Sequence, residues 1–285
     1  MLRPKDVEVL ILGAGWTSEF LIDLLKENAI SYAATHTTDR DKDKDGERTI
    51  TFKFDPASKD VEPYKKLPAA TTVLITFPLV GHGQSKHLVE LYDTAHGWGS
   101  EQRQWIQLGS TGIFTAPHWN DHSSPYDRSD SRAIAEDELL ALGGTVLNLA
   151  GLYGGKRDPH TWVKRVARTK EAVKGKKALH LIYGGDVARG ILGCHLNWKK
   201  VEKRRWLLTD LRVYDWWDLI QAWGAGMKSD VEGEEDLEYE KWVGELMVEE
   251  RVRSLPRSPE VLERVLDSRA FWEALGIWPV YGRAK

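Results

Sequence analysis

The chain has 285 residues, which suits one large α/β domain or a domain with a smaller lobe. Hydrophobic residues make up 41% and charged residues 29%, and the formal net charge of −3 gives no electrostatic reason to expect nucleic acid or an anionic membrane as a partner. The single cysteine, Cys194, excludes an intramolecular disulfide, so we expect a reducing, cytoplasmic location. We expect no membrane span and no signal peptide, because no apolar run is long enough for a span and a core strand begins almost at once.

Short apolar runs alternate with helical periodicity through the first half of the chain. Each run has the length and β-branched content of a buried strand, and the segments between several of them carry apolar residues at helical spacing. This alternation predicts a parallel sheet with helices on both faces. The expected strands are 7–12, 31–35, 49–54, 72–77, 104–108 and 145–149, and the expected helices are 16–26, 85–96 and 131–142.

The pattern loosens after residue 155. Helices are expected at 160–172 and 186–196, and the acidic stretch 228–250 has the composition of an exposed helix or loop. We therefore divide the chain into a dinucleotide-binding core, 1–155, and a segment 156–285 with the remaining sheet elements and a C-terminal lobe. A single interleaved domain is the alternative.

The stretch VLILGAGWTSEF joins the first strand to the first helix through two glycines. Gly13 permits the tight turn, and Gly15 lets the backbone approach a pyrophosphate that the helix N-terminus, at Trp16 and Thr17, would then hold. Ser18 replaces the third glycine of the usual fingerprint, which serves helix packing and not phosphate contact. The stretch therefore predicts nucleotide binding on a doubly wound parallel Rossmann sheet with a small α-rich lobe.

The end of the second strand bears on which nucleotide would bind. No carboxylate stands at the strand end itself, whereas His36, Thr37 and Arg40 offer donors that suit a 2′-phosphate. This composition favours NADP, and Asp39 leaves NAD open.

Further motifs follow in an order that is specific when they are taken together. The motifs are Asp55 after the third strand, QLGSTGIF at 107–114, SRAIAE at 131–136, NLAGLYG at 148–154 and IYGGDVA at 182–188. With these motifs and the glycine turn, the chain resembles the extended and atypical short-chain dehydrogenase/reductases, which are NAD-dependent epimerase/dehydratase-like proteins, over residues 7–197.

The resemblance implies roles for individual residues. Asp55 would bond the adenine amino group, and Phe77 and Pro78 would line the cofactor. Leu149 and Gly151 would lie near the nicotinamide. Ser110 would polarise a substrate carbonyl or alcohol, and Asp186 would have a structural role.

The acid–base pair of that family, a tyrosine and a lysine four residues later, is missing here. Arg132 falls at the lysine position and Arg128 at the tyrosine position, while Tyr126 lies two residues too early. An arginine binds ribose hydroxyls but does not relay protons. We therefore take Ser110, Tyr126 and Arg132 as the candidate catalytic set, with Tyr126 reaching the site only if its loop is not helical.

Other candidates for proton transfer or binding stay open beside that set. His82, His118 and His122 follow strand ends and titrate near neutral pH, although a solvated loop position explains each equally well. Cys194 is expected to fill the core, and no histidine–carboxylate spacing predicts a metal site. Tryptophans 198, 206, 216, 217 and 223 could wall an apolar pocket, and residues 199, 200 and 203–205 form a basic cluster.

These features together predict an NADP-dependent oxidoreductase, either a reductase, a dehydrogenase or an epimerase, acting on a small, apolar or aromatic organic molecule as a monomer or homodimer. A redox-neutral enzyme and an NADP-binding regulatory protein are the alternatives, because the tyrosine–lysine pair is absent.

Overall fold

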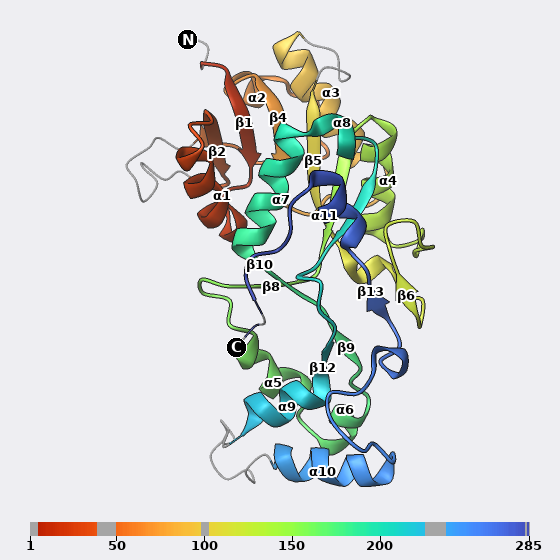
Figure 1. Ribbon diagram of the computed structural model, residues 1–285. Coiled ribbons are helices and arrows are strands. Elements are labelled where there is room, and N and C mark those ends of the chain that lie inside the picture. The colour runs from red at the N-terminus through yellow and green to blue at the C-terminus, as the bar shows by residue number, and fades with distance from the viewer. Residues whose placement is uncertain (1–4, 39–49, 98–102, 226–237, 283, 285) are drawn as a thin grey trace.

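A seven-stranded sheet forms the upper part of the molecule in Figure 1. The structure is a computed structural model that describes residues 5–38, 50–97, 103–225, 238–282 and 284. All neighbouring strands are parallel, in the order β11-β7-β5-β4-β1-β2-β3. The strands are β1 (Val7–Leu12), β2 (Tyr32–His36), β3 (Ile50–Thr51), β4 (Ala70–Ile75), β5 (Gln104–Ser110), β7 (Thr145–Leu149) and β11 (Arg205–Leu208).

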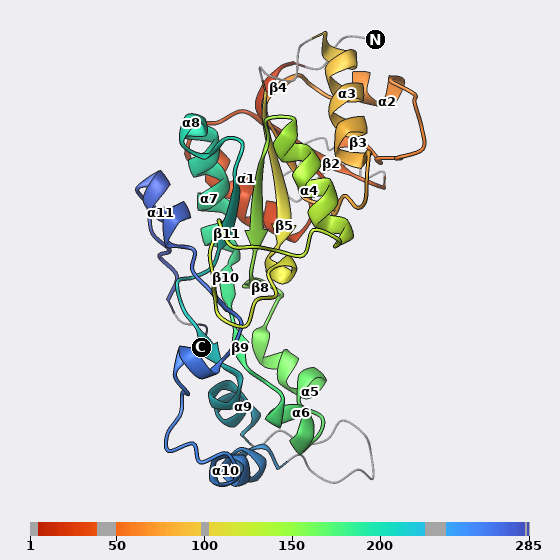
Figure 2. The same cartoon turned by 90° about the vertical axis from the view of Figure 1, so that its right-hand side faces the viewer.

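Helices cover both faces of this sheet, as Figure 2 shows. The face with α1 (Trp16–Glu27), α7 (Gly184–Leu196), α8 (Trp198–Val201) and α11 (Arg269–Leu275) encloses one apolar cluster, and the face with α2 (Glu62–Lys65), α3 (Gln84–His96) and α4 (Ser131–Ala141) encloses another. The central strands are apolar on both faces because both faces are covered. The predicted doubly wound Rossmann sheet is confirmed.

A smaller lobe, composed mainly of helices, lies below the carboxyl edge of the sheet (Figure 1). Its strand pairs have at most three residues a strand, so helix packing and side-chain bonds hold it together. The predicted α-rich lobe is confirmed. Its elements are β8 (Gly151–Tyr153), β10 (Leu181–Tyr183), β9 (Ala178–Leu179), β12 (Tyr214–Asp215), α5 (Trp162–Val166), α6 (Lys170–Lys174), α9 (Trp216–Gly224) and α10 (Tyr239–Glu249), with β6 (Trp119–Asn120) and β13 (Val265–Leu266) pairing beside it.

Three sequence-based expectations for the second half of the chain differ from the structure. The helix expected at 160–172 is divided into α5 and α6, because Thr169 adopts an extended conformation and its side chain caps α6 through the Ala172 N–H. The acidic stretch contains α10, which buries Tyr239, Val243 and Leu246 and is not simply exposed; residues 226–237 lie outside the described residues. Arg205, the last residue of the basic cluster that could have been a solvated face, is buried and begins strand β11 of the sheet.

Cys194 lies in α7 with no exposed surface, in accord with the expected core position. Burial raises the pKa of its thiol well above the ordinary value. Within the described part of the chain, none of the helices combines the length and the apolar character that crossing a bilayer would take.

Candidate functional site

A cavity of about 450 Å³ opens at the carboxyl edge of the sheet, where β1, β4, β5 and β7 end. In open α/β sheets this edge, beside the point where the strand order reverses, is where ligands bind. The cavity is lined by Gly13, Gly15, Trp16, Thr17, Thr76, Phe77, Leu108, Gly109, Ser110, Arg132, Leu149, Ala150, Leu152 and Arg157.

Threonines from both neighbouring strands fix the glycine turn after β1. The Gly13 N–H donates to Thr35 Oγ1 on β2 at 2.9 Å, and Thr76, just past β4, donates to the Leu12 carbonyl at 3.0 Å. Gly13 has a φ of +87°, and a Cβ there would stand 2.9 Å from Thr76 Oγ1. Gly13 is therefore required by the protein's own backbone.

Gly15 differs from Gly13 because the protein leaves room for a side chain there. A Cβ at Gly15 would meet its nearest described neighbour, the Gly13 carbonyl, only at 3.9 Å. Gly15 is the N-cap of α1 and no side chain among the described residues caps the helix, so the amides of its first turn face the cavity edge. The open space at Gly15 fits the close approach of an anionic ligand.

Ser18, at the third glycine position, is buried in α1 with 3% of its surface exposed. Its hydroxyl has no hydrogen-bond partner among the described residues. The position therefore accommodates a small side chain within the helix packing and takes no part in lining the cavity.

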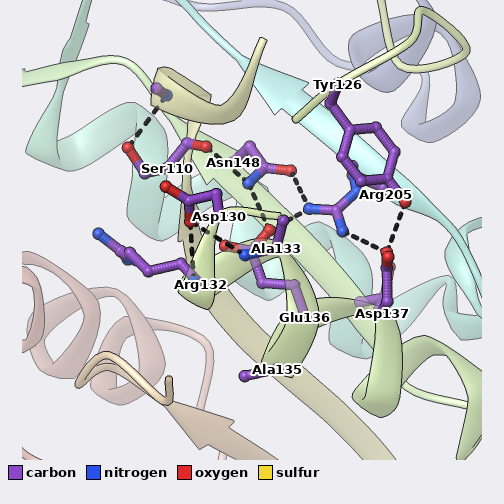
Figure 3. Close-up of polar contacts among 12 residues, drawn as sticks. Ser110, Tyr126, Asp130, Arg132, Ala133, Ala135, Glu136, Asp137, Asn148 and Arg205 are labelled. Atoms are coloured by element: carbon purple, nitrogen blue, oxygen red, sulfur yellow. Dashed lines mark hydrogen bonds and ion pairs between the residues drawn. The ribbon is translucent and has the colours of Figure 1, made fainter. Parts of the chain in front are cut away.

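Ser110 ends β5 and presents its hydroxyl to the cavity. Its Oγ accepts from the Gly112 N–H at 3.1 Å, and its carbonyl accepts from Asn148 Nδ2 at 2.9 Å. The first bond orients the side chain and the second holds the backbone of Ser110, and the Ser110 O–H can still donate to a ligand. Figure 3 shows these contacts.

Behind Ser110, a buried ionic network joins α4, β7 and β11 (Figure 3). Glu136 is fully buried and accepts from Arg205 Nη1 and from Asn148 Nδ2. Arg205 also bonds Asp137 Oδ1 at 2.8 Å. A Cβ on Gly109 would come within 2.6 Å of Asn148 Nδ2, so the glycine of the β5 motif makes room for this network.

Arg132 and Tyr126, both predicted to be catalytic, lie on opposite sides of that network in Figure 3. Arg132 lines the cavity, and its buried Nε has no partner among the described residues. Tyr126 is absent from the described lining; its hydroxyl donates to Asp137 at 2.6 Å, and Arg205 stacks on its ring at 4.5 Å. Burial and the bond to Asp137 raise the Tyr126 pKa.

The predicted histidines do not line this cavity either. His82 is exposed between two glycines with positive φ, and His118 is exposed before β6. His122 is half-buried and stacks on Trp206 at 5.2 Å. The structure therefore brings Ser110 and Arg132 together without any of them.

Six of the predicted cofactor residues lie in the cavity, and their contact with a cofactor stays a prediction: Gly13, Gly15, Trp16, Thr17, Phe77 and Leu149. Outside it, His36 is the last residue of β2 and Thr37 follows it, and the Asp55 carboxylate accepts from the Ala57 N–H in an exposed turn. Pro78 is exposed, Gly151 lines a neighbouring cavity, and Arg40 lies outside the described residues.

The sequence analysis missed Arg157, which reaches the cavity from the loop after β8. Its guanidinium stacks on the Trp16 ring at 4.4 Å, and Trp16 Nε1 donates to the Gly154 carbonyl of the same loop at 3.0 Å. The glycine-rich run GGKR at 154–157 was the available signal. The described lining thus contains two arginines and no carboxylate, histidine, lysine or tyrosine.

A second cavity, the lobe cavity, has a volume of about 640 Å³ and shares Leu152 and Arg157 with the first. It is lined by Gly151, Leu152, Lys156, Arg157, Asp158, Thr161, Trp162, Arg165, Val166, Leu179 and Trp216. Of the tryptophans expected to wall a pocket, Trp216 is here, whereas Trp206 and Trp217 are buried in the core.

Solved structures share this architecture along nearly the whole chain. UDP-glucose 4-epimerase from Thermus thermophilus in complex with NAD has a TM-score of 0.62 and 16% identity, covering 97% of this chain and 95% of that one. A short-chain dehydrogenase/reductase superfamily protein from Agrobacterium tumefaciens with bound NAD has a TM-score of 0.56 and 11% identity, covering 96% and 93%. The chain has the fold of the short-chain dehydrogenase/reductases.

The same fold occurs in a functionally unknown conserved protein from Silicibacter pomeroyi, with a TM-score of 0.62 and 17% identity over 98% of this chain and 95% of that one. No protein-family model matches the sequence, and no curated protein matches it. At these identities the short-chain dehydrogenase/reductase fold is established, and function must be argued from the cavity residues.

Proposed function

We propose that the protein is an NADP(H)-dependent oxidoreductase or epimerase acting on a small organic molecule. One observation supports this most: a single cavity brings the glycine turn of β1 together with Ser110 and Arg132. The turn fits a dinucleotide pyrophosphate, and two arginines without a lining carboxylate fit a polyanion. Bound NADP(H) would supply the hydride donor or acceptor.

Residues of the cavity would bind the cofactor and polarise the substrate. The amides at Trp16 and Thr17 would hold the pyrophosphate, and Arg132 would bind ribose hydroxyls through a guanidinium whose Nε lacks a partner in the described structure. The Ser110 hydroxyl would donate to the oxygen of a substrate carbonyl or alcohol and stabilise the charge that develops there. Since the described lining holds no carboxylate, histidine, lysine or tyrosine, the proton on that oxygen would exchange with water through the cavity mouth.

A second candidate, an NADP-binding regulatory protein, is favoured by one specific observation. Tyr126, the tyrosine nearest to the family's acid, contributes its hydroxyl to the buried network and not to the cavity. A sensor needs the glycine turn and Arg132 but no proton donor. Turnover of any carbonyl compound with NADPH, abolished by Ser110→Ala, would decide for the enzyme.

The binding proposal is tested with Gly15→Ala, because the free protein has space for the added methyl group. NADPH titrated against tryptophan fluorescence should bind the parent protein, and the variant should bind at least about tenfold more weakly. Its melting temperature should not fall. Gly244→Ala, on a helix with open space around it, is the matched control: it should leave the NADPH affinity unchanged and raise the melting temperature through helix propensity.

Equal NADPH affinity in Gly15→Ala and the parent would contradict the phosphate site at the glycine turn. If neither NADPH nor NADH binds at millimolar concentration, the proposal fails. Arg40→Glu tests the cofactor preference: the ratio of NADPH to NADH affinity should fall, since a carboxylate repels the 2′-phosphate.

A further inference from the structure

The lining of the lobe cavity has more cationic than anionic side chains. Lys156, Arg157 and Arg165 line it, against one carboxylate, Asp158. Asp158 is already engaged, since its Oδ1 accepts from His160 Nδ1 at 2.6 Å. No described carboxylate forms an ion pair with any of the three cations. The cavity therefore carries three exposed cations against one carboxylate, and this excess of positive charge suits an anionic ligand.

Two tryptophan side chains, Trp162 and Trp216, line the same cavity. Trp216 begins α9 and is 8% exposed, and Trp162 begins α5. A Cβ on Gly151 would lie 3.3 Å from the Trp162 ring, so the absence of a side chain at Gly151 lets the indole approach β8 closely. Val166 and Leu179 complete the apolar part. Indole faces of this kind favour a planar ring as their partner.

The lobe cavity adjoins the cavity of the glycine turn through Arg157 and Leu152, which line both. The loop that carries Arg157 is tied to α1 by the Trp16 hydrogen bond to the Gly154 carbonyl. A ligand in the lobe cavity would therefore lie beside the first cavity, at the side lined by Leu152 and Arg157.

We propose that the lobe cavity is the substrate site and takes a small molecule with a planar apolar ring that bears an anionic group, either a carboxylate or a phosphate. The ring lies between the two tryptophans and the anion meets Arg165 and Lys156. This inference rests on the proposed function, because the first cavity is reserved for the dinucleotide.

Calorimetric titration in saturating NADP+ tests the proposal with 1-naphthoate, 1-naphthyl phosphate and the neutral 1-naphthamide. One or both anions should bind, and which one binds identifies the anionic group. Arg165→Gln should weaken that binding roughly tenfold or more, because a charge-assisted contact is lost. Arg168→Gln is the matched control, since Arg168 is exposed on the same segment and lines neither cavity.

Two outcomes would overturn the inference: 1-naphthamide binding as tightly as the anions, or Arg165→Gln and Arg168→Gln having equal effects. Inorganic phosphate binding as tightly as 1-naphthyl phosphate would refute the role of the ring. Binding of NADPH without any naphthyl anion contradicts this inference alone. Naphthyl anion binding without NADPH contradicts the proposed function and leaves the ligand class of the lobe cavity standing.

Discussion

The two halves of the sheet build their sides of the cavity by different means. Beside β1, β2 and β4, a backbone turn at Gly13 is held by two threonine hydroxyls and surrounded by apolar strands. Beside β5, β7 and β11, Ser110 rests on a buried ionic network centred on Glu136 and Arg205. The side proposed to hold the dinucleotide keeps the glycine turn on which the resemblance in the sequence rests, and the side proposed to perform the chemistry lacks the tyrosine–lysine pair that the resemblance implies.

This difference concerns the positions where the resemblance implies a catalytic tyrosine and lysine. Arg132, at the position where the resemblance implies a lysine, places a permanent charge in the cavity, and Tyr126 is bound by Asp137 and Arg205 outside the described lining. We expect the stability of the β5, β7 and β11 side to depend on the pairing of buried charges. We expect the glycine-turn side to depend on the space that small residues leave. Substitutions on the two sides and in the lobe test this difference.

Glu136→Gln should have the largest effect. It leaves the buried Arg205 guanidinium with a weaker partner, and breaking a buried pair costs about 3–5 kcal/mol of unfolding free energy. Urea denaturation measures the loss. The control is Glu90→Gln, which removes an exposed pair with Lys86 at 3.7 Å and should cost less than about 1 kcal/mol. Equal costs would show that the buried network contributes no more than a surface pair.

Acid should also act on His180, a buried ionisable group between β9 and β10 in the lobe. Burial lowers the pKa of His180 from 6.5 to about 4, and the nearby Arg264 charge adds to this. The neutral ring accepts from the Leu266 N–H and donates to the Arg212 carbonyl. Because the unfolded chain takes up the proton first, this contribution is complete above pH 6.5 and is lost as the pH falls towards 4, by at most about 3 kcal/mol.

Asp210 opposes that dependence. Burial raises its pKa from 3.8 to about 6, so its contribution is complete below pH 3.8 and is lost as the pH rises through 6. Asp210→Asn should therefore make the acid destabilisation steeper, and His180→Asn should make it shallower or reverse it. Urea unfolding across this pH range measures both slopes. Two parallel curves would indicate that neither group is coupled to folding.

Ser18→Ala should have the smallest effect and concerns the glycine-turn side. It removes a buried hydroxyl without a described partner, so the stability should be unchanged or rise by about 1 kcal/mol, with NADPH affinity unaltered. Ser18→Gly should be less stable than Ser18→Ala by roughly 1 kcal/mol through helix propensity. A large loss in Ser18→Ala would reveal a bond that the hydroxyl makes in solution.

The sequence predicted the sheet well because its strands are apolar runs with a regular spacing, and β1, α3 and β7 lie close to the expected ranges. The glycine turn and Ser110 were found because a local motif specifies each. Arg157 and the lobe cavity were not found, since they depend on which loop folds back against Trp16. The role of Arg205 was also hidden, because nothing in a run of basic residues tells which one will be buried in a strand.

Cys194 offers a final consequence. A thiol reagent can reach this side chain only when α7 separates from the sheet, since the sulfur has no exposed surface in the folded protein. With one cysteine in the chain, the labelling rate reports a single structural event. Ligand-induced slowing of that rate would measure how strongly occupation of either cavity stabilises the packing of α7 against the sheet and α1.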